Sequence, residues 1–425
     1  MHTLTQLRNG ELKGAATLKL SEDLSQFPEE IFELADTLET LDLSGTGLSE
    51  LPKDFGRLKK LKVFFCSDNN FTYLPGELGD CLTLDIVGFK SNKIETIFPK
   101  SINCNLRWLI LTNNKIRELP STIGGCTRMQ KLMLAGNRLT DLPETLQNCR
   151  NLRLLRISAN RLNGLPDWLL SMPKLSWLAF SGNPFVRSPK IEALDLISWT
   201  DLELKHILGQ GASGIIYQVR RNSRVLAEQL AVKVFKGEVT SDGLPEDEMN
   251  TCITAGLHPG LVKLVGQISN HPENKKGLVM ELIPSNFHNL GAPPTLESCT
   301  KDVFPEGLKL TSEKALKIAS TIASVAAQLH NKKIMHGDLY AHNILIDNDC
   351  NTLFSDFGAA TIYENPLLEK IEVSAFGYLL ADLIGLCRVD DNNLTVEKLR
   401  KLQKKCQQEL PNLRPRFESI AMELG

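Results

Sequence analysis

Residues 336–343, His-Gly-Asp-Leu-Tyr-Ala-His-Asn, place a carboxylate and an amide five positions apart in an apolar setting. A second carboxylate, Asp356, follows within Ser-Asp-Phe-Gly. Carboxylate and amide oxygens are the ligands that a hard cation such as Mg²⁺ prefers. A carboxylate that accepts or orients a hydroxyl proton suits phosphoryl transfer. The spacing therefore indicates phosphoryl transfer, but it leaves open whether the acceptor is a protein or a small molecule.

Upstream, Gly209, Gly211 and Gly214 form a G-x-G-x-x-G pattern between two β-prone runs. A dinucleotide-binding turn has the same spacing, but such a turn opens a helix. Here the run Gly-Ile-Ile-Tyr-Gln-Val, which begins at Gly214, predicts a strand and not a helix. The glycines therefore indicate a flap between two strands, whose backbone amides can cover phosphates. Lys233 follows alone in the apolar run AVKVF. Its charge needs a partner, which phosphate oxygens and a carboxylate would provide.

Together, GQGASGIIYQV, AVK, HGDLYAHN and DFG resemble the eukaryotic-type protein kinase fold, an α+β structure of two lobes. The resemblance covers residues 202–425 and includes FESI near the end, which looks like the final helix of that fold. It implies that the protein uses ATP and Mg²⁺. It also implies a strand at 279–283 whose backbone meets the adenine, with Met280, Glu281 and Leu282 as nucleotide-binding residues.

The resemblance also implies a role for each residue of these motifs. Lys233 would contact the phosphates of ATP, positioned by a carboxylate on the following helix. We assign that carboxylate to Glu248, with Glu246 and Asp247 as rivals. Asp338 would accept or orient the acceptor hydroxyl, while Asn343 and Asp356 would hold the metal. His336 is expected to be a structural hydrogen-bonding residue.

Several positions depart from the family pattern. Gly337 stands where many protein kinases have an Arg that grips a phosphorylated activation loop, which predicts that phosphorylation between Phe357 and Glu372 is not the switch. Tyr340 stands where Ser/Thr-specific kinases usually have Lys. The activation segment is short and lacks Ala-Pro-Glu, so we expect Glu364 to pair with Arg414.

Two further features concern the C-terminal lobe. Glu372 is expected to begin the helix EVSAFGYLLADL. The lobe should be compact, because a helix is missing between this segment and VEKLRKLQKKC.

The first half repeats a leucine-rich frame that closes on an Asn every 22 or 23 residues. These Asn residues are Asn69, Asn92, Asn114, Asn137, Asn160 and Asn183, with Thr46 in an earlier copy. The frame resembles the leucine-rich repeat, an α/β solenoid, over residues 12–188 with about eight copies. Stacked copies bury one continuous core. We expect the Asn side chains to satisfy backbone groups at the bends rather than to bind a ligand.

Two other residue sets share the repeat period. Cys81, Cys104, Cys126 and Cys149 are expected to be small buried residues rather than a metal cluster, because no Cys-x-x-Cys pair is present. The face of the strands carries charged and aromatic side chains. This face is either simply solvated or a protein-binding surface. They are Glu39, Asp42, Lys62, Asp85, Arg107, Lys131, Met133, Arg153, Arg156 and Trp177.

The repeat frame stops after Phe185, and residues 189–201 read as a linker. Trp199 either packs against the last repeat or belongs to the core of the second domain. The net charge of −2 gives no reason to expect nucleic acid. The chain has no run long enough for a membrane span, no signal-peptide layout and ten cysteines. We therefore expect a cytoplasmic protein with reduced thiols; its oligomeric state stays open.

These observations predict a Mg-ATP-dependent protein kinase, directed at Ser or Thr, whose solenoid binds partner or substrate proteins. A small-molecule phosphotransferase of the aminoglycoside or choline kinase type also begins its catalytic loop with His-Gly-Asp-Leu, but it does not usually carry the glycine flap followed by Ala-Val-Lys. A pseudokinase scaffold is the third possibility. It is disfavoured because Lys233, Asp338, Asn343 and Asp356 are all present.

Overall fold

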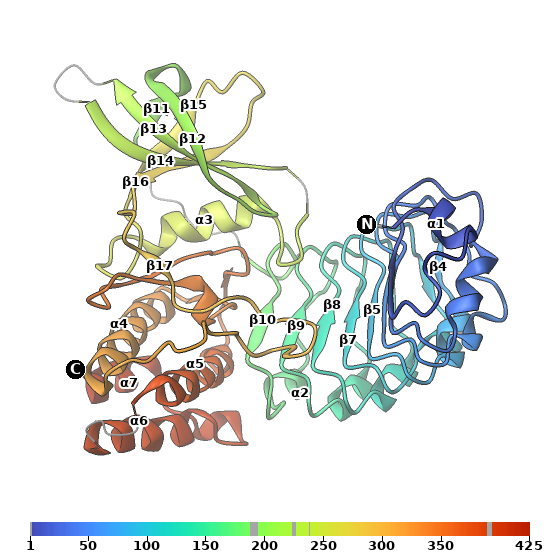
Figure 1. Ribbon diagram of the computed structural model, residues 1–425. Coiled ribbons are helices and arrows are strands. Elements are labelled where there is room, and N and C mark those ends of the chain that lie inside the picture. The colour runs from blue at the N-terminus through green and yellow to red at the C-terminus, as the bar shows by residue number, and fades with distance from the viewer. Residues whose placement is uncertain (1, 188–193, 223–226, 238, 389–392) are drawn as a thin grey trace. The chain divides into compact units, whose positions relative to one another are not determined.

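The computed structural model describes residues 2–187, 194–222, 227–237, 239–388 and 393–425 (Figure 1). The chain divides into two compact units. The first comprises Met1–Lys174 and Asn183–Phe185, and the second comprises Leu175–Gly182 and Val186–Gly425. Of the predicted linker at 189–201, only residues 194–201 lie within the described part.

The first unit is a stack of short parallel strands joined by tight return segments. It opens with α1 (Leu4–Arg8), which begins with a capping box between Thr3 and Gln6. Neighbouring strands of the main sheet follow chain order. The strands of this sheet that belong to the first unit are β1 (Thr17–Lys19), β2 (Thr40–Asp42), β3 (Val63–Phe65), β5 (Ile86–Gly88), β7 (Trp108–Ile110), β8 (Lys131–Met133) and β9 (Leu154–Arg156).

The return segments are mostly 3₁₀ turns, which compact each repeat into a few residues. A small second sheet pairs β4 (Tyr73–Leu74) with β6 (Thr96–Ile97). The turns are η1 (Glu29–Leu34), η2 (Phe55–Arg57), η3 (Gly76–Asp80), η4 (Pro99–Ser101), η5 (Ser121–Gly125) and η6 (Glu144–Asn148), and the last return is helix α2 (Asp167–Leu170).

The recurring Asn residues form the structural ladder that the sequence predicts. Asn69 accepts hydrogen bonds at Oδ1 from the backbone N–H groups of Thr46 and Leu48, at 3.1 and 3.0 Å, and its Nδ2 donates to the carbonyl of Leu43 at 2.8 Å. Asn92 repeats the pattern one copy later, between Phe71 N–H and Cys66 O. Each amide therefore joins two neighbouring repeats and satisfies backbone groups that the bend would leave unpaired.

The periodic cysteines divide into two environments. Cys81, Cys126 and Cys149 are buried, as expected for small core residues, and burial raises the pKa of the Cys149 thiol to about 11. Cys104 is exposed, so the expectation is wrong for this copy. Thiols with raised pKa values are poor nucleophiles at neutral pH, which suits a packing role.

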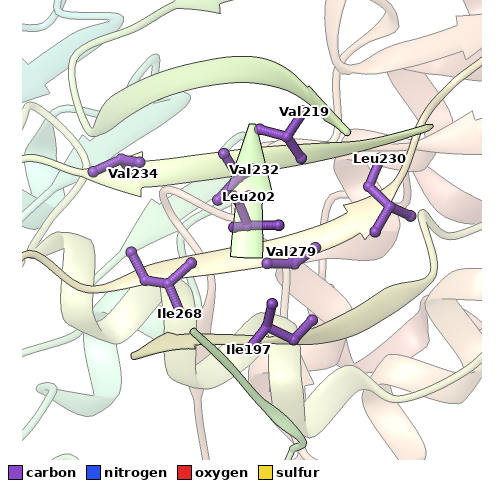
Figure 2. Packing of buried hydrophobic residues seen from close by; sticks show 8 residues of the cluster. All are labelled: Ile197, Leu202, Val219, Leu230, Val232, Val234, Ile268 and Val279. Atoms are coloured by element: carbon purple, nitrogen blue, oxygen red, sulfur yellow. The ribbon is translucent and has the colours of Figure 1, made fainter. Parts of the chain in front are cut away.

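The second unit begins with a six-stranded sheet whose strand order is β11-β15-β16-β14-β13-β12. Its strands are β11 (Leu196–Ser198), β12 (Leu202–Gln210), β13 (Gly214–Asn222), β14 (Ala227–Phe235), β15 (Leu264–Ser269) and β16 (Gly277–Glu281). Branched apolar side chains gather on this sheet around Val219, Val232 and Val279 (Figure 2). Trp199 packs against this cluster, which decides its assignment in favour of the second unit.

The remainder of the second unit is mainly helical (Figure 1). Helix α5 is buried over most of its length and packs against α4 and α6. Helix α5 ends at Leu386 and α6 begins at Asn393, and the described residues between them, 387 and 388, form no helix, as expected for a compact lobe. The helices are α3 (Pro245–Ala255), α4 (Ser312–Asn331), α5 (Leu367–Leu386), α6 (Asn393–Cys406) and α7 (Phe417–Leu424), with the short turn η9 (Pro411–Leu413) before α7.

Short strands position the motifs between these helices. The sheet β17-β19-β20 consists of β17 (His288–Asn289), β19 (Ile344–Ile346) and β20 (Thr352–Phe354). A two-stranded ribbon pairs β18 (Ile334–Met335) with β21 (Thr361–Ile362). Residues 336–343 thus lie between β18 and β19, and Asp356 lies just beyond β20.

Candidate active site

The glycine pattern forms the turn between β12 and β13, on the wall of a cavity of about 570 Å³. The strand predicted after Gly214 is confirmed, and it pairs with β14 so that Ile216 lies opposite Lys233. A Cβ at Gly214 would lie 2.6 Å from the carbonyl of Val234, so this position requires glycine. Gly209 and Gly211 face open space within 4 Å, which leaves room for a ligand to approach the backbone closely.

On the same cavity, Lys233 of β14 forms an ion pair with Glu248 of α3. Burial would lower the pKa of Lys233, but the charges of Glu248 and Asp356 outweigh it and raise the pKa. The rival Glu246 is exposed and pairs with Lys276 at 2.5 Å. The structure therefore places Glu248, rather than its neighbour, beside the lysine.

Asp338 and Asn343 contact each other within the loop between β18 and β19. The Asn343 side-chain amide donates to the Asp338 carboxylate at 2.7 Å and to the Asp338 carbonyl at 2.9 Å. Both hydrogen bonds use the amide nitrogen of Asn343 as the donor. The amide oxygen of Asn343 is therefore the atom that can bind a cation. Asn343 also lines the cavity.

Asp356 lines the cavity together with Asn343. Its backbone lies in the left-handed region, with φ of +60°, and its Oδ1 accepts a hydrogen bond from Gly358 N–H at 3.1 Å. A non-glycine residue in this region is uncommon and is typical of functional sites. The carboxylate and the Asn343 amide oxygen are hard donors on one cavity wall, so the donor set fits Mg²⁺.

Sequence reasoning missed His342, which lies near Asp338, and Asp302, which contacts His342. His342 Nε2 lies 4.0 Å from the Asp338 carboxylate, and its Nδ1 lies 2.7 Å from Asp302. Burial would lower the pKa of His342, but the hydrogen bond to Asp302 and the charge of Asp338 raise it. The position of His342 inside the motif was a usable signal, whereas Asp302 follows no motif.

His336 and Glu372 stabilise the loop between β18 and β19. The His336 ring stacks on Phe354 at 3.8 Å, and its Nε2 lies 3.1 Å from the carbonyl of Ser355. Burial lowers the pKa of His336, which keeps the ring neutral. This arrangement matches the structural role expected for His336.

Glu372 accepts hydrogen bonds from the backbone N–H groups of His336 and Gly337, at 3.0 and 2.7 Å, and lies 2.8 Å from His330. Burial would raise its pKa, but the hydrogen bond and charge of His330 and the Gly337 N–H lower it. The expectation that Glu372 begins a helix is wrong. Helix α5 begins at Leu367, because the chain turns into the helix directly after Pro366.

The predicted adenine-contacting residues separate into two groups. Met280 lines the cavity with Lys233 and Asp356. Glu281 and Leu282 instead line an adjoining hollow of about 460 Å³, and the Glu281 side chain pairs with Lys263 at 2.6 Å. Alternation along β16 turns the Glu281 side chain to the face opposite that of Met280, and Leu282 follows the end of the strand.

The pairing expected between Glu364 and Arg414 is wrong. Glu364 is 70% exposed and pairs with Arg187 at 2.9 Å. Arg414 is buried, and its guanidinium donates to the carbonyls of Gln408 and Lys370, each at 2.9 Å. A buried guanidinium needs several acceptors, and these backbone carbonyls provide two of them.

The geometry above is that of a kinase site, and a family model described as a protein kinase domain matches residues 202–419, half of the chain. The chain belongs to the protein kinase family. Models described as leucine-rich repeats match residues 37–58, 104–148 and 127–185, so repeats precede the kinase domain.

Curated relatives of this kinase include a serine/threonine-protein kinase of Arabidopsis thaliana, AtPK2/AtPK19, 30% identical over 48% of this chain and 41% of the relative. A probable serine/threonine-protein kinase of Dictyostelium discoideum is 28% identical over 44% of this chain and 12% of the relative. The rust resistance kinase Lr10 of Triticum aestivum is 32% identical over 37% of this chain and 23% of the relative. The chain thus spans less than half the length of each of these relatives. Within its described residues, none of the helices is both long enough and apolar enough to cross a membrane.

Proposed function

We propose that this protein is a Mg-ATP-dependent protein kinase directed at Ser or Thr hydroxyls, and that its repeats bind partner or substrate proteins. One observation supports the proposal most strongly. A single cavity of about 570 Å³ is lined by the glycine turn, Lys233, Glu248, Asn343 and Asp356. Residues from the glycine turn, β14, α3 and the loops around Asn343 and Asp356 therefore line one cavity that carries both acidic and basic side chains.

In the proposed mechanism, the backbone amides of the glycine turn cover the ATP phosphates, and the ammonium of Lys233 neutralises their charge. Glu248 keeps that ammonium aimed into the cavity. Asp338, held by the Asn343 amide, orients the acceptor hydroxyl and receives its proton. Position and charge supply most of the rate, because phosphoryl transfer needs little covalent chemistry from the protein.

Asn343 and Asp356 are the residues that would hold Mg²⁺, which supplies charge neutralisation at the phosphates when it is bound. The raised pKa of Glu248 has a related cause. Burial comes first, and the charge of Asp356 adds to it, while Lys233 acts in the opposite direction. The cavity lining includes the Asp356 carboxylate in addition to the Lys233–Glu248 ion pair, and a bound cation would balance this carboxylate.

The acceptor class rests on the relatives, two of which are named serine/threonine-protein kinases. For the repeats, exposed ion pairs such as Lys62–Glu39 occur on the strand face, and a polar face of this kind suits a protein partner. All ten cysteines are free thiols, which supports a reducing, cytosol-like compartment.

The test uses the purified full chain with labelled ATP, Mg²⁺ and a generic protein substrate, beside Asp338→Asn. The proposal expects label on Ser or Thr of the substrate and loss of that label in the variant. Label on an aminoglycoside or choline in place of the protein would favour a small-molecule phosphotransferase and overturn the proposal. Binding of ATP without any transfer would favour the scaffold reading and overturn the proposal.

A further inference from the structure

Residues 175–182 carry the sequence frame of a leucine-rich repeat, yet they belong to the compact unit that contains the kinase domain. The segment contains strand β10 (Trp177–Ala179), all three residues of which are buried. Trp177 holds the same place in its repeat, six residues before the Asn, as Trp108 holds before Asn114. The two tryptophans therefore offer a matched pair within one frame.

Trp177 contacts the catalytic loop at two neighbouring residues. Its indole Nε1 donates a hydrogen bond to the carbonyl of Leu339 at 3.0 Å, and its ring stacks on Tyr340 at 4.2 Å with an angle of 6°. Both contacts lie immediately after Asp338. The indole is only 1% exposed, so the hydrogen bond is shielded from water and worth more than one on the surface.

The same segment contacts the loop on the other side of Asp338. A Cβ at Gly337 would lie 2.7 Å from the carbonyl of Leu178 and 2.8 Å from that of Ala359, and Gly337 has φ of +74°. Any larger side chain at this position, including the Arg of many relatives in the family, would displace the Leu178 backbone. Ser176 extends the attachment through a hydrogen bond of 2.9 Å between its hydroxyl and that of Ser374 in α5.

We propose that residues 175–182 are a brace for the catalytic loop, and that Trp177 is a positioning residue for Asp338. Gly337 and Leu339, the residues on either side of Asp338, both contact the brace. The brace orders the catalytic loop, a role that an Arg at position 337 and a phosphorylated activation loop would otherwise fill. The absence of this Arg and the contact with residues 175–182 are therefore two parts of one adaptation. This inference rests on the proposed kinase function.

The first experiment compares Trp177→Leu, Trp177→Phe and the matched control Trp108→Leu in the full chain, with labelled ATP and a generic substrate. Displacement of Asp338 should slow the chemical step. We expect Trp177→Leu to lower kcat roughly 30-fold or more, with the KM for ATP within about threefold of the wild type. Phenylalanine keeps a stacking ring but lacks the donor, so Trp177→Phe should recover part of the loss. Trp108→Leu should stay within about twofold, because its indole contacts Met133 and Lys131 in the first unit.

A second readout does not depend on activity. Amide hydrogen exchange at residues 336–343 should rise roughly tenfold or more in Trp177→Leu, and it should be unchanged in Trp108→Leu. Gly337→Ala, which displaces the Leu178 carbonyl, should reproduce the rise, and it carries the test if Trp177→Leu does not fold.

The two proposals fail in different ways. A wild type that transfers no label would refute the kinase function, and the exchange data would still decide the brace. Exchange at 336–343 that is unchanged in folded Trp177→Leu, or kcat within threefold of an active wild type, would overturn the brace.

Discussion

The proposed nucleotide side and the proposed acceptor side of this site are built in different ways. On the nucleotide side, Lys233, Glu248 and Asp356 meet at one cavity through contacts within the kinase domain. On the acceptor side, Gly337 and Tyr340 contact Leu178 and Trp177, which come from a segment with the frame of a repeat. The first side follows the family pattern, and the second departs from it where another part of the chain takes over the support of the loop.

On the nucleotide side, the comparison predicts a large loss of activity when the charge of Asp356 is removed. Asp356→Asn removes the carboxylate that would hold the metal, and we expect phosphoryl transfer to fall roughly 1000-fold or more. Initial rates of label transfer from ATP measure the effect. The exposed turn residue Asp349 provides the control, and Asp349→Asn should leave the rate unchanged. A loss of less than tenfold in Asp356→Asn would remove this residue from the metal site.

On the acceptor side, we expect the protein to lose stability when Tyr340 is replaced by the Lys that is usual at this position in Ser/Thr-specific kinases. Tyr340→Lys places an ammonium where Tyr340 is 5% exposed and stacked on Trp177. Desolvation of that charge should lower the free energy of unfolding by about 2 to 4 kcal/mol. Tyr340→Phe keeps the stack and should cost less than about 1 kcal/mol. Denaturant unfolding measures both, and a Tyr340→Lys variant as stable as the wild type would break the comparison.

Within the nucleotide side, two adjacent carboxylates should differ sharply. Glu248→Gln leaves the Lys233 ammonium without its buried partner, and we expect kcat/KM to fall roughly 10- to 100-fold. Glu246→Gln removes only an exposed pair with Lys276 and should change the rate less than twofold. Steady-state kinetics with varied ATP separate them. Equal losses in the two variants would show that the ion pair in the cavity has no special role.

The smallest predicted effect is a pH dependence of stability at Asp382 of α5, which lines a hollow with Trp177 and Tyr340 on the acceptor side. Burial, aided by the charge of Asp302 and opposed by Lys301, raises the pKa of Asp382 from 3.8 to about 7. Between these values the folded chain keeps a proton that the unfolded chain releases, so stability falls as pH rises toward 7.

Asp382→Asn lacks this proton and should not show the decline. From pH 5 to pH 8, the wild type should lose roughly 1 to 3 kcal/mol relative to Asp382→Asn. Thermal unfolding at several pH values measures this difference, with the exposed Glu418→Gln as the control. Parallel stability curves for the wild type and Asp382→Asn would contradict the prediction.

Local patterns in the sequence predict much of this molecule. The repeat period identifies the Asn ladder, because each Asn69-type amide serves the copy next to it. Strand–glycine–strand around Gly214 and the lone Lys233 in an apolar run identify the flap and its partner strand. These features are encoded within about 25 residues, so inspection of one chain is sufficient to find them.

Contacts between distant segments are what the sequence does not predict. Trp177 and Leu339 are 162 positions apart, and the frame around Trp177 predicts an open repeat face instead of a buried brace. Asp302 beside His342 and the path of α5 past Glu372 likewise depend on tertiary packing. Side-chain alternation along β16, which turns Glu281 away from the cavity, is visible only once its register is fixed.

The rate of label transfer by the dephosphorylated full chain, before and after phosphorylation of its activation segment, tests the central claim most directly. If the brace holds the catalytic loop, the dephosphorylated chain transfers phosphate to protein substrate, and phosphorylation between Phe357 and Glu372 changes the rate less than about twofold. Asp338→Asn should abolish transfer in both states. A dephosphorylated chain that binds ATP but becomes active only after phosphorylation would contradict the account.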